Sequence, residues 1–210
     1  ATAYDRLDPI LLAIAARADD GTPCAARLGN AGAVGHFVKM MHNGIEYADM
    51  QLIAEIYDIL SRGQRLGAAE IAGVFEAWRE GPLSSFLIDV TATVLRREDP
   101  ETGRPLVDMV LDTAGQKGTG RWASIAGLEL GVAAPSIAEA VSARVVSSLQ
   151  SERAAAGARF TRPGGTASKV DNLQLADALL AGKICAYAQG FAVLAAASDA
   201  NGWKLALDKV

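Results

Sequence analysis

The chain has 210 residues, a formal net charge of −4 and a composition that is 50% hydrophobic and 21% charged. This much apolar material excludes a disordered chain and is enough for one or two hydrophobic cores. The acidic balance and the 6% share of aromatic residues exclude the clustered cations and base-stacking platform of a nucleic-acid-binding surface, so we expect no nucleic-acid partner.

The first elements are short and irregular. Apolar residues at helical spacing predict a helix over 4–18, followed by a turn over 19–23, a short strand over 24–28 and a glycine-rich segment over 29–35. The sequence begins without methionine or a targeting segment, and it ends within a helical pattern. We therefore interpret both ends as cut, and residues 1–29 as the remnant of a junction with another domain.

The rest of the chain reads as helices separated by loops that contain glycine or proline. Periodicity near 3.6 dominates, and the alternation typical of strands is almost absent. Pro82 is expected in the first turn of its helix, where its missing N–H does no harm. The predicted helices lie over 33–60, 68–78, 83–96, 106–113, 135–157 and 170–200, with loops over 97–105, 114–120 and 162–165. We therefore predict an all-α domain over 30–210.

The last predicted helix contains the longest uncharged run near the end of the chain, 184–198. This run of about fifteen residues is shorter than the roughly 18–20 residues that a membrane-spanning helix needs. The high mean hydropathy of +0.18 is therefore interpreted as buried helices and an oligomer interface, with no membrane partner.

The two cysteines, Cys24 and Cys185, lie far apart in the sequence. Neither stands in a cluster of Cys and His, which a zinc site or a disulfide framework would need. We therefore expect reduced thiols, no metal site and a cytoplasmic protein.

Five polar side chains share one arc of the predicted helix 33–60. At about 100° per residue, Lys39, His42, Asn43, Glu46 and Tyr47 fall within roughly 140° and about two turns. The other sides of this helix are largely apolar, so a buried helix would need these groups to be paired or to line a cavity. Lys39 and Glu46, about 10 Å apart along the axis, suit two groups that act on different atoms of one small polar molecule. A solvated polar face is the alternative.

A glycine-rich loop and a helical arginine are the other candidates. Glycines at 115, 118 and 120 surround Lys117, which offers backbone N–H groups and a cation to an anion such as phosphate. The order of glycine and lysine is not that of a nucleotide P-loop. Arg144 could bind a phosphate or carboxylate with two hydrogen bonds. A plain surface turn and an ordinary exposed arginine remain alternatives.

Together these segments resemble the 6-phosphogluconate dehydrogenase family, within the β-hydroxyacid dehydrogenase superfamily. The resemblance rests on blocks 35–53, 111–122 and 139–153, with further similarity over 183–190. Gly35-x3-Lys39-x3-Asn43 is the broader superfamily pattern, whereas the added His and Glu-Tyr and the Lys-Gly-Thr-Gly-x-Trp loop are much more specific. The resemblance implies the multi-helix C-terminal-like domain of this family, truncated and without the N-terminal Rossmann domain.

The resemblance also implies an activity, the NADP-linked oxidative decarboxylation of 6-phosphogluconate to ribulose 5-phosphate in the pentose phosphate pathway, by a homodimer. Lys39 would be the general base at the C3 hydroxyl, and Glu46 the acid that protonates C1. Burial would promote a neutral Lys39 and a protonated Glu46. The residues that would position or bind the substrate are His42, Asn43, Tyr47, Lys117 and Arg144.

Several parts of the family pattern are missing from this sequence. Nothing reads as the Gly-x-Gly-x-x-Gly turn of a dinucleotide-binding domain, and the family's Ser-Gly-Gly substrate loop and the C-terminal half of its helical domain are absent. We therefore expect the NADP site to lie outside this chain and the chain to be inactive alone; the choice between NADP and NAD stays open. Two alternatives remain, another β-hydroxyacid dehydrogenase and a helical dimerisation module without catalysis.

Overall fold

The computed structural model describes residues 2–18, 20–29, 31–160 and 170–210. In this part of the chain the regular elements are all helices, with only isolated bridges between Arg17 and Pro23 and between Glu98 and Pro105, so the all-α prediction is confirmed. The predicted loop 162–165 lies outside the described residues. The helices are α1 (Ala3–Ile14), α2 (Val34–Asp58), α3 (Ala68–Ala77), α4 (Phe86–Arg96), α5 (Leu106–Met109), α6 (Thr119–Glu129), α7 (Pro135–Ser148), α8 (Gln150–Arg159) and α9 (Asn172–Asn201), with a π-helical turn η1 (Ile59–Gly63) after α2 and a 3-10 turn η2 (Leu207–Lys209) near the end.

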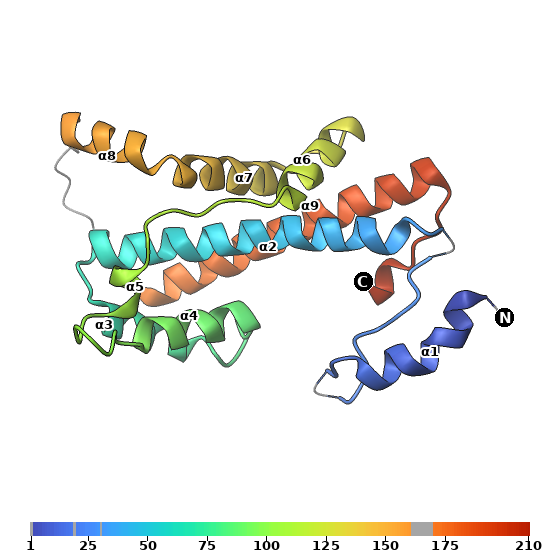
Figure 1. Cartoon of the computed structure of the whole chain (residues 1–210), viewed down its shortest axis with the longest axis horizontal. Coiled ribbons are helices and arrows are strands. Elements are labelled where there is room, and N and C mark those ends of the chain that lie inside the picture. Colours follow the sequence, from blue (N-terminus) through green and yellow to red (C-terminus); the bar gives the residue numbers. More distant parts are fainter. Residues whose placement is uncertain (1, 19, 30, 161–169) are drawn as a thin grey trace.

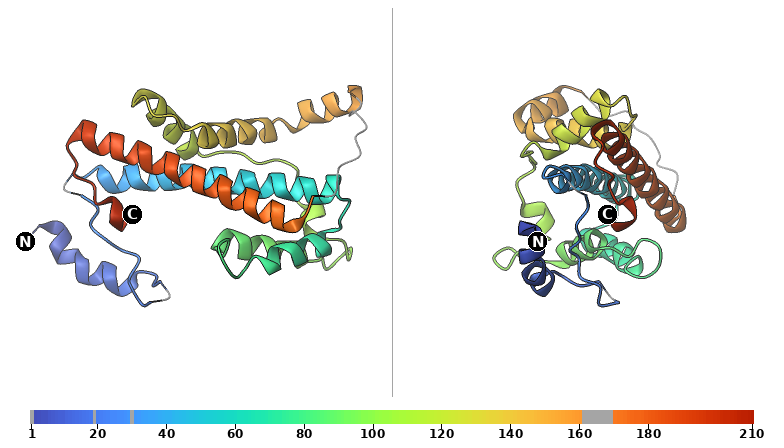
Figure 2. Two further views of the ribbon diagram at one scale, coloured as in Figure 1. Left: turned by 180° about the vertical axis from the view of Figure 1, so that it is seen from behind. Right: turned by 90° about the vertical axis from the view of Figure 1, so that its right-hand side faces the viewer.

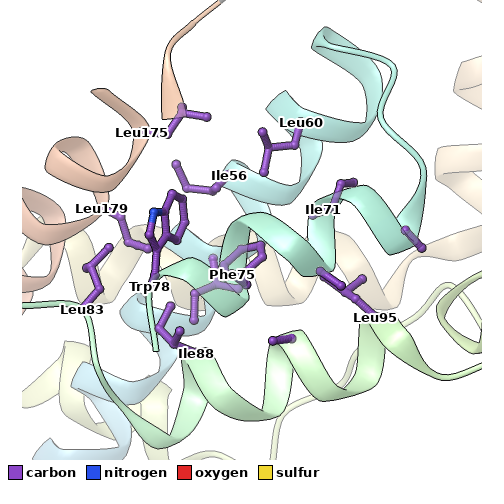
Figure 3. Close-up of a cluster of buried hydrophobic side chains, with 14 residues drawn as sticks. Ile56, Leu60, Ile71, Phe75, Trp78, Leu83, Ile88, Leu95, Leu175 and Leu179 are labelled. Carbon is purple, nitrogen blue, oxygen red and sulfur yellow. The ribbon is translucent and has the colours of Figure 1, made fainter. Parts of the chain in front are cut away.

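Two long helices, α2 and α9, form the centre of the bundle and cross each other (Figures 1 and 2). Helices α3 and α4 lie on one side of this pair, and α6 and α7 on the other (Figure 1). Each side has its own hydrophobic core. The α3–α4 core gathers Phe75, Trp78, Leu60, Leu175 and neighbours (Figure 3). The α6–α7 core gathers Met41, Ile45, Ile137, Val193, Leu194 and neighbours. Both cores contain side chains of α2 and α9, so the other helices of the bundle are positioned by packing against these two.

Glycine allows the closest approach of α9 to α2. A Cβ placed on Gly190 would lie 2.5 Å from Cδ1 and 2.6 Å from Cγ1 of Ile45, whose side chain is itself buried. Because helix-interior glycine is unfavourable by roughly 0.5–1 kcal/mol relative to alanine, its use here reflects packing and not helix propensity.

Gly190→Ala should therefore lower the free energy of unfolding by about 1–3 kcal/mol, because overpacking outweighs the gain in propensity. Urea unfolding of the chain measures this. The matched control is Gly157→Ala in α8, where nothing lies within 4 Å of the new Cβ; that change should be neutral or stabilise by up to about 1 kcal/mol. Equal effects of the two changes would contradict the packing argument.

The N-terminal segment differs from the prediction. Helix α1 ends at Ile14 instead of residue 18 and has no buried residue, and Figure 1 shows it apart from the bundle. The predicted strand over 24–28 is wrong: these residues form no regular element, and the nearest pairing is the isolated bridge between Arg17 and Pro23. The segment is fixed at its end instead, where the Leu28 carbonyl accepts a hydrogen bond from the Ala206 N–H at 3.2 Å.

Helix α6 is missing from the prediction, which assigned 114–120 to a loop and nothing to the residues that follow. The loop ends two residues earlier, at Gly118, whose φ of 105° is a left-handed conformation that favours glycine. Gly120 is already helical and buried. Glycines that start a helix and let it pack closely were therefore mistaken for glycines that prevent one.

Three other predicted helices have different ends. The predicted helix 135–157 is divided at Leu149, whose ψ of 53° breaks the helical path. Helix α4 starts at Phe86 instead of 83, because buried Leu83 packs in the α3–α4 core from a non-helical segment, so Pro82 precedes the helix. Helix α5 stops at Met109, and the next two residues are exposed and gain nothing from helical packing.

Helix α9 is long and apolar enough, by length and composition alone, to cross a membrane. The length of the uncharged run 184–198 was therefore not enough to exclude a membrane-spanning helix. Core helices have the same properties, and α9 packs on α2 and α7. Its Gln189 accepts a hydrogen bond from the Ser136 N–H at 2.9 Å, which ties its middle to α7.

Candidate functional site

Three polar side chains of the α2 arc approach the same nitrogen atom of the fourth, His42. Nδ1 of His42 lies 3.3 Å from Nζ of Lys39, 3.4 Å from Oδ1 of Asn43 and 4.0 Å from Oε2 of Glu46. Lys39 and Glu46 are too far apart in sequence to form an i,i+4 pair, yet both reach the same side chain between them. The structure thus places an amine and a carboxyl on one helix face, on either side of a histidine.

This face is more open than predicted. Lys39 and His42 are exposed, and the His42 and Glu46 side chains retain 59% and 39% of their accessible surface. The buried residues of α2, among them Met41 and Ile45, point into the two cores and leave the polar arc outside. Asn43, Glu46 and Tyr47 are half-buried, so the described residues shield one part of the arc and leave Lys39 and His42 exposed.

The arc borders two hollows instead of one. His42 and Glu46 line a cavity of about 320 Å³ together with Asp49, Tyr187, Phe191 and others. Lys39 lines a second hollow of about 430 Å³ with Thr119, Trp122, Trp203 and others. The expectation that Lys39 and Glu46 share a single hollow is not met by the described residues, although their polar atoms meet at His42.

The glycine loop packs against the same face of α2 where it runs into α6. Nδ2 of Asn43 lies 3.4 Å from Oγ1 of Thr119, to which it donates a hydrogen bond. A Cβ on Gly120 would lie 3.0 Å from the ring of Tyr47, so this glycine allows the first turn of α6, directly after the loop, to approach the arc. Thr119 was not predicted as a site residue. Its place two residues after Lys117, in the same motif, was the signal available.

Arg144 connects α7, the loop and α2. Its guanidinium lies over the Tyr47 ring at 4.7 Å from the centroid, in cation–π geometry, and its Nη1 donates to the Gly115 carbonyl at 3.2 Å. Lys117 is exposed and forms no ion pair with any residue that the structure describes. Arg144 is therefore anchored at the loop, whereas Lys117 is exposed on it.

A buried ion pair lies one turn beyond Glu46 and was not predicted. Nζ of Lys183 in α9 lies 2.9 and 2.7 Å from the two carboxylate oxygens of Asp49 in α2, and both side chains are only about a tenth exposed. The sequence had offered 183–190 only as a segment of family similarity. The pair joins α2 to α9 at the turn that follows Glu46.

Comparison with known proteins matches residues 35–210 to the family model "6-phosphogluconate dehydrogenase, C-terminal domain". The chain is 47% identical to a decarboxylating 6-phosphogluconate dehydrogenase of Bacillus licheniformis and 46% identical to an NAD(+)-dependent one of Bacillus subtilis, over 99% of this chain and 45% of each relative. It is also similar to a solved 6-phosphogluconate dehydrogenase of Plasmodium falciparum, described in complex with NADP+ and with 6-phosphogluconate, with a TM-score of 0.90, 37% identity and coverage of 99% and 45%. The chain thus spans less than half the length of the relatives it matches.

Proposed function

Because the chain belongs to the family of 6-phosphogluconate dehydrogenase C-terminal domains, we propose that it is the helical, substrate-binding part of an enzyme that converts 6-phosphogluconate to ribulose 5-phosphate by oxidative decarboxylation. The observation that carries the proposal is the meeting of Lys39 and Glu46 at one imidazole, with the glycine loop packed on the same helix face. A solvated polar face would not need a glycine to bring a phosphate-binding loop against it.

Lys39 and Glu46, at the two ends of the arc, carry out different proton transfers in the reaction. Lys39 takes the proton of the C3 hydroxyl as this carbon is oxidised, and returns it to the same oxygen when the carboxyl leaves as carbon dioxide and its electron pair moves toward that oxygen. Glu46 then protonates the former C2 of the substrate, which becomes C1 of ribulose 5-phosphate. His42 lies between them, where its imidazole and the amide of Asn43 orient the sugar hydroxyls. The exposed arc leaves room for a substrate and for a covering domain.

Substrate binding falls to the loop and α7. Lys117 and Arg144 supply two positive charges for the phosphate, and the Tyr47 ring under the Arg144 guanidinium keeps that group in place. Charge-assisted hydrogen bonds from such groups are short and strong. We place the reaction in the pentose phosphate pathway, in the cytoplasm and in a homodimer, as the family resemblance implies.

Oxidation at C3 also needs a hydride acceptor, which a bound nicotinamide dinucleotide would supply. The described residues include no strand and therefore no strand–turn–helix unit that could hold it, so we propose that NADP binds outside this chain. Residues 1–34 lie outside the matched family model, and α1 has no buried residue; both support our assignment of 1–29 to a junction with the dinucleotide-binding domain. Relatives include an NAD(+)-dependent and an NADP(+)-dependent enzyme, and we assign the choice of cofactor to that domain too.

The substrate assignment is tested with the full-length protein that carries this chain. Oxidation of 6-phosphogluconate should exceed that of 3-hydroxyisobutyrate by about 10²–10⁴-fold in kcat/KM, because losing the phosphate leaves two cations unpaired, at roughly 1.5–3 kcal/mol for each charged hydrogen bond. The 210-residue chain alone, which should form no NADPH, is the control. A preference for the unphosphorylated acid would favour another β-hydroxyacid dehydrogenase, and no turnover of either would favour a dimerisation module.

A further inference from the structure

The loop that carries Lys117 is held from behind by the corner between α7 and α8. In the first turn of α8, Arg153 donates from Nη1 to the Asp112 carboxylate at 2.9 Å and from Nη2 to the Asp112 carbonyl at 2.6 Å. Ser147, near the end of α7, accepts a hydrogen bond from the Ala114 N–H at 3.1 Å. The corner therefore binds the backbone of the loop at two residues just before its glycines.

The break between α7 and α8 makes this arrangement possible. At Leu149 the chain leaves the helical path, and the Ser147 carbonyl, freed from the α-helical pattern, accepts a 3.0 Å hydrogen bond from Nη2 of Arg153. This contact folds Arg153 back toward the loop, where its side chain is 30% exposed. A continuous helix would carry Arg153 along the α7 axis and away from Asp112.

The start of the loop has little else to hold it. Residues 110–118 form no regular element, and Val110 and Leu111 are more than half exposed, so packing does not order the residues before the glycines. Arg144 adds one bond at Gly115. Lys117 follows two residues later and has no ion pair among the described residues, so its position depends on the loop backbone, which the corner holds on one side and the buried Gly118 on the other.

We propose that Arg153 and Ser147 are positioning residues for Lys117, which order the loop so that its ammonium and backbone N–H groups face the phosphate of the substrate. The proposal rests on the proposed function. Neither residue touches substrate; both act through the loop, by removing conformational freedom that binding would otherwise have to remove.

The test is steady-state kinetics of the full-length enzyme with Arg153→Gln and the milder Ser147→Ala. Arg153→Gln should raise KM for 6-phosphogluconate about tenfold, equal to about 1.4 kcal/mol, and change kcat less than about twofold because the groups at C1 and C3 are untouched. Arg153→Lys should restore part of the loss. Arg159→Gln, an exposed arginine at the other end of α8, is the matched control and should leave KM unchanged.

A double-mutant cycle with Lys117→Met separates positioning from general stabilisation. If Arg153 acts through Lys117, the tenfold effect should shrink to less than about twofold in the Lys117→Met background. An unchanged KM in Arg153→Gln and Ser147→Ala, or fully additive effects with Lys117→Met, would overturn the inference while the proposed function stands. A wild-type enzyme that does not oxidise 6-phosphogluconate would overturn both.

Discussion

Replacing Lys39 by methionine should lower kcat for 6-phosphogluconate in the full-length enzyme by about 10²–10⁴-fold, the range expected when a general base is lost. Methionine keeps the length and apolar stem of lysine but cannot accept the C3 hydroxyl proton. Because Lys39 is exposed and its Nζ has a polar contact with no described residue other than His42, at 3.3 Å, the midpoint of thermal unfolding should hardly change. Steady-state kinetics and a thermal melt measure the two quantities.

Lys39→Arg distinguishes a base from a simple positive charge. The guanidinium keeps the cation but stays protonated in proteins, so a base at this position predicts that Lys39→Arg is nearly as inactive as Lys39→Met. Lys117→Met is the control on the binding side and should act mainly on KM. Retention of most activity in Lys39→Arg would show that Lys39 only attracts an anion, and retention in Lys39→Met would remove it from the reaction.

The sequence predicted the elements that depend on local pattern. The period near 3.6 and the lack of proline over 33–60 gave α2 within a few residues, and the arc from Lys39 to Tyr47 followed from helix geometry alone. The sequence pattern predicted the wrong structure where a glycine is compatible with both a loop and a closely packed helix. At Gly118 and Gly120 the same residue type starts a helix and admits a neighbouring ring, and only the tertiary partner, Tyr47, decides between loop and helix.

The burial of the site residues could not be predicted from the sequence pattern of α2 alone. The apolar sides of α2 predicted that it is covered, but not which face other helices would cover. In the structure the two cores take the sides with Met41 and Ile53, and Lys39 and His42 of the arc are left exposed. The contact of Tyr47 with Arg144 joins residues almost a hundred positions apart, and no spacing rule connects such distant positions. The hydrogen bond from Arg153 to the Ser147 carbonyl across the α7–α8 break likewise follows from no spacing rule.

The ion pair between Asp49 and Lys183 leads to the largest expected change in stability. Asp49→Leu removes one partner and leaves the Lys183 ammonium in a site where its side chain is only 11% exposed. Removing one partner of a buried pair typically lowers the free energy of unfolding by about 3–5 kcal/mol, because the remaining charge has lost its compensation. Urea unfolding of the chain should show this loss, since the pair joins the two helices on which both cores are built.

Two controls separate the uncompensated charge from the loss of an attraction. Asp58, at the end of α2, pairs with Arg62 in the turn η1, but there the two side chains are 50% and 58% exposed, so Asp58→Leu should cost no more than about 1 kcal/mol. Asp49→Leu combined with Lys183→Met removes both charges and should recover most of the lost stability, as apolar replacement of buried pairs commonly does. If the double variant were as unstable as Asp49→Leu, the pair itself, and not the avoidance of a buried lone charge, would hold α2 against α9. The polar arc would then depend on this pair for its direction, and the double variant should lose activity along with stability.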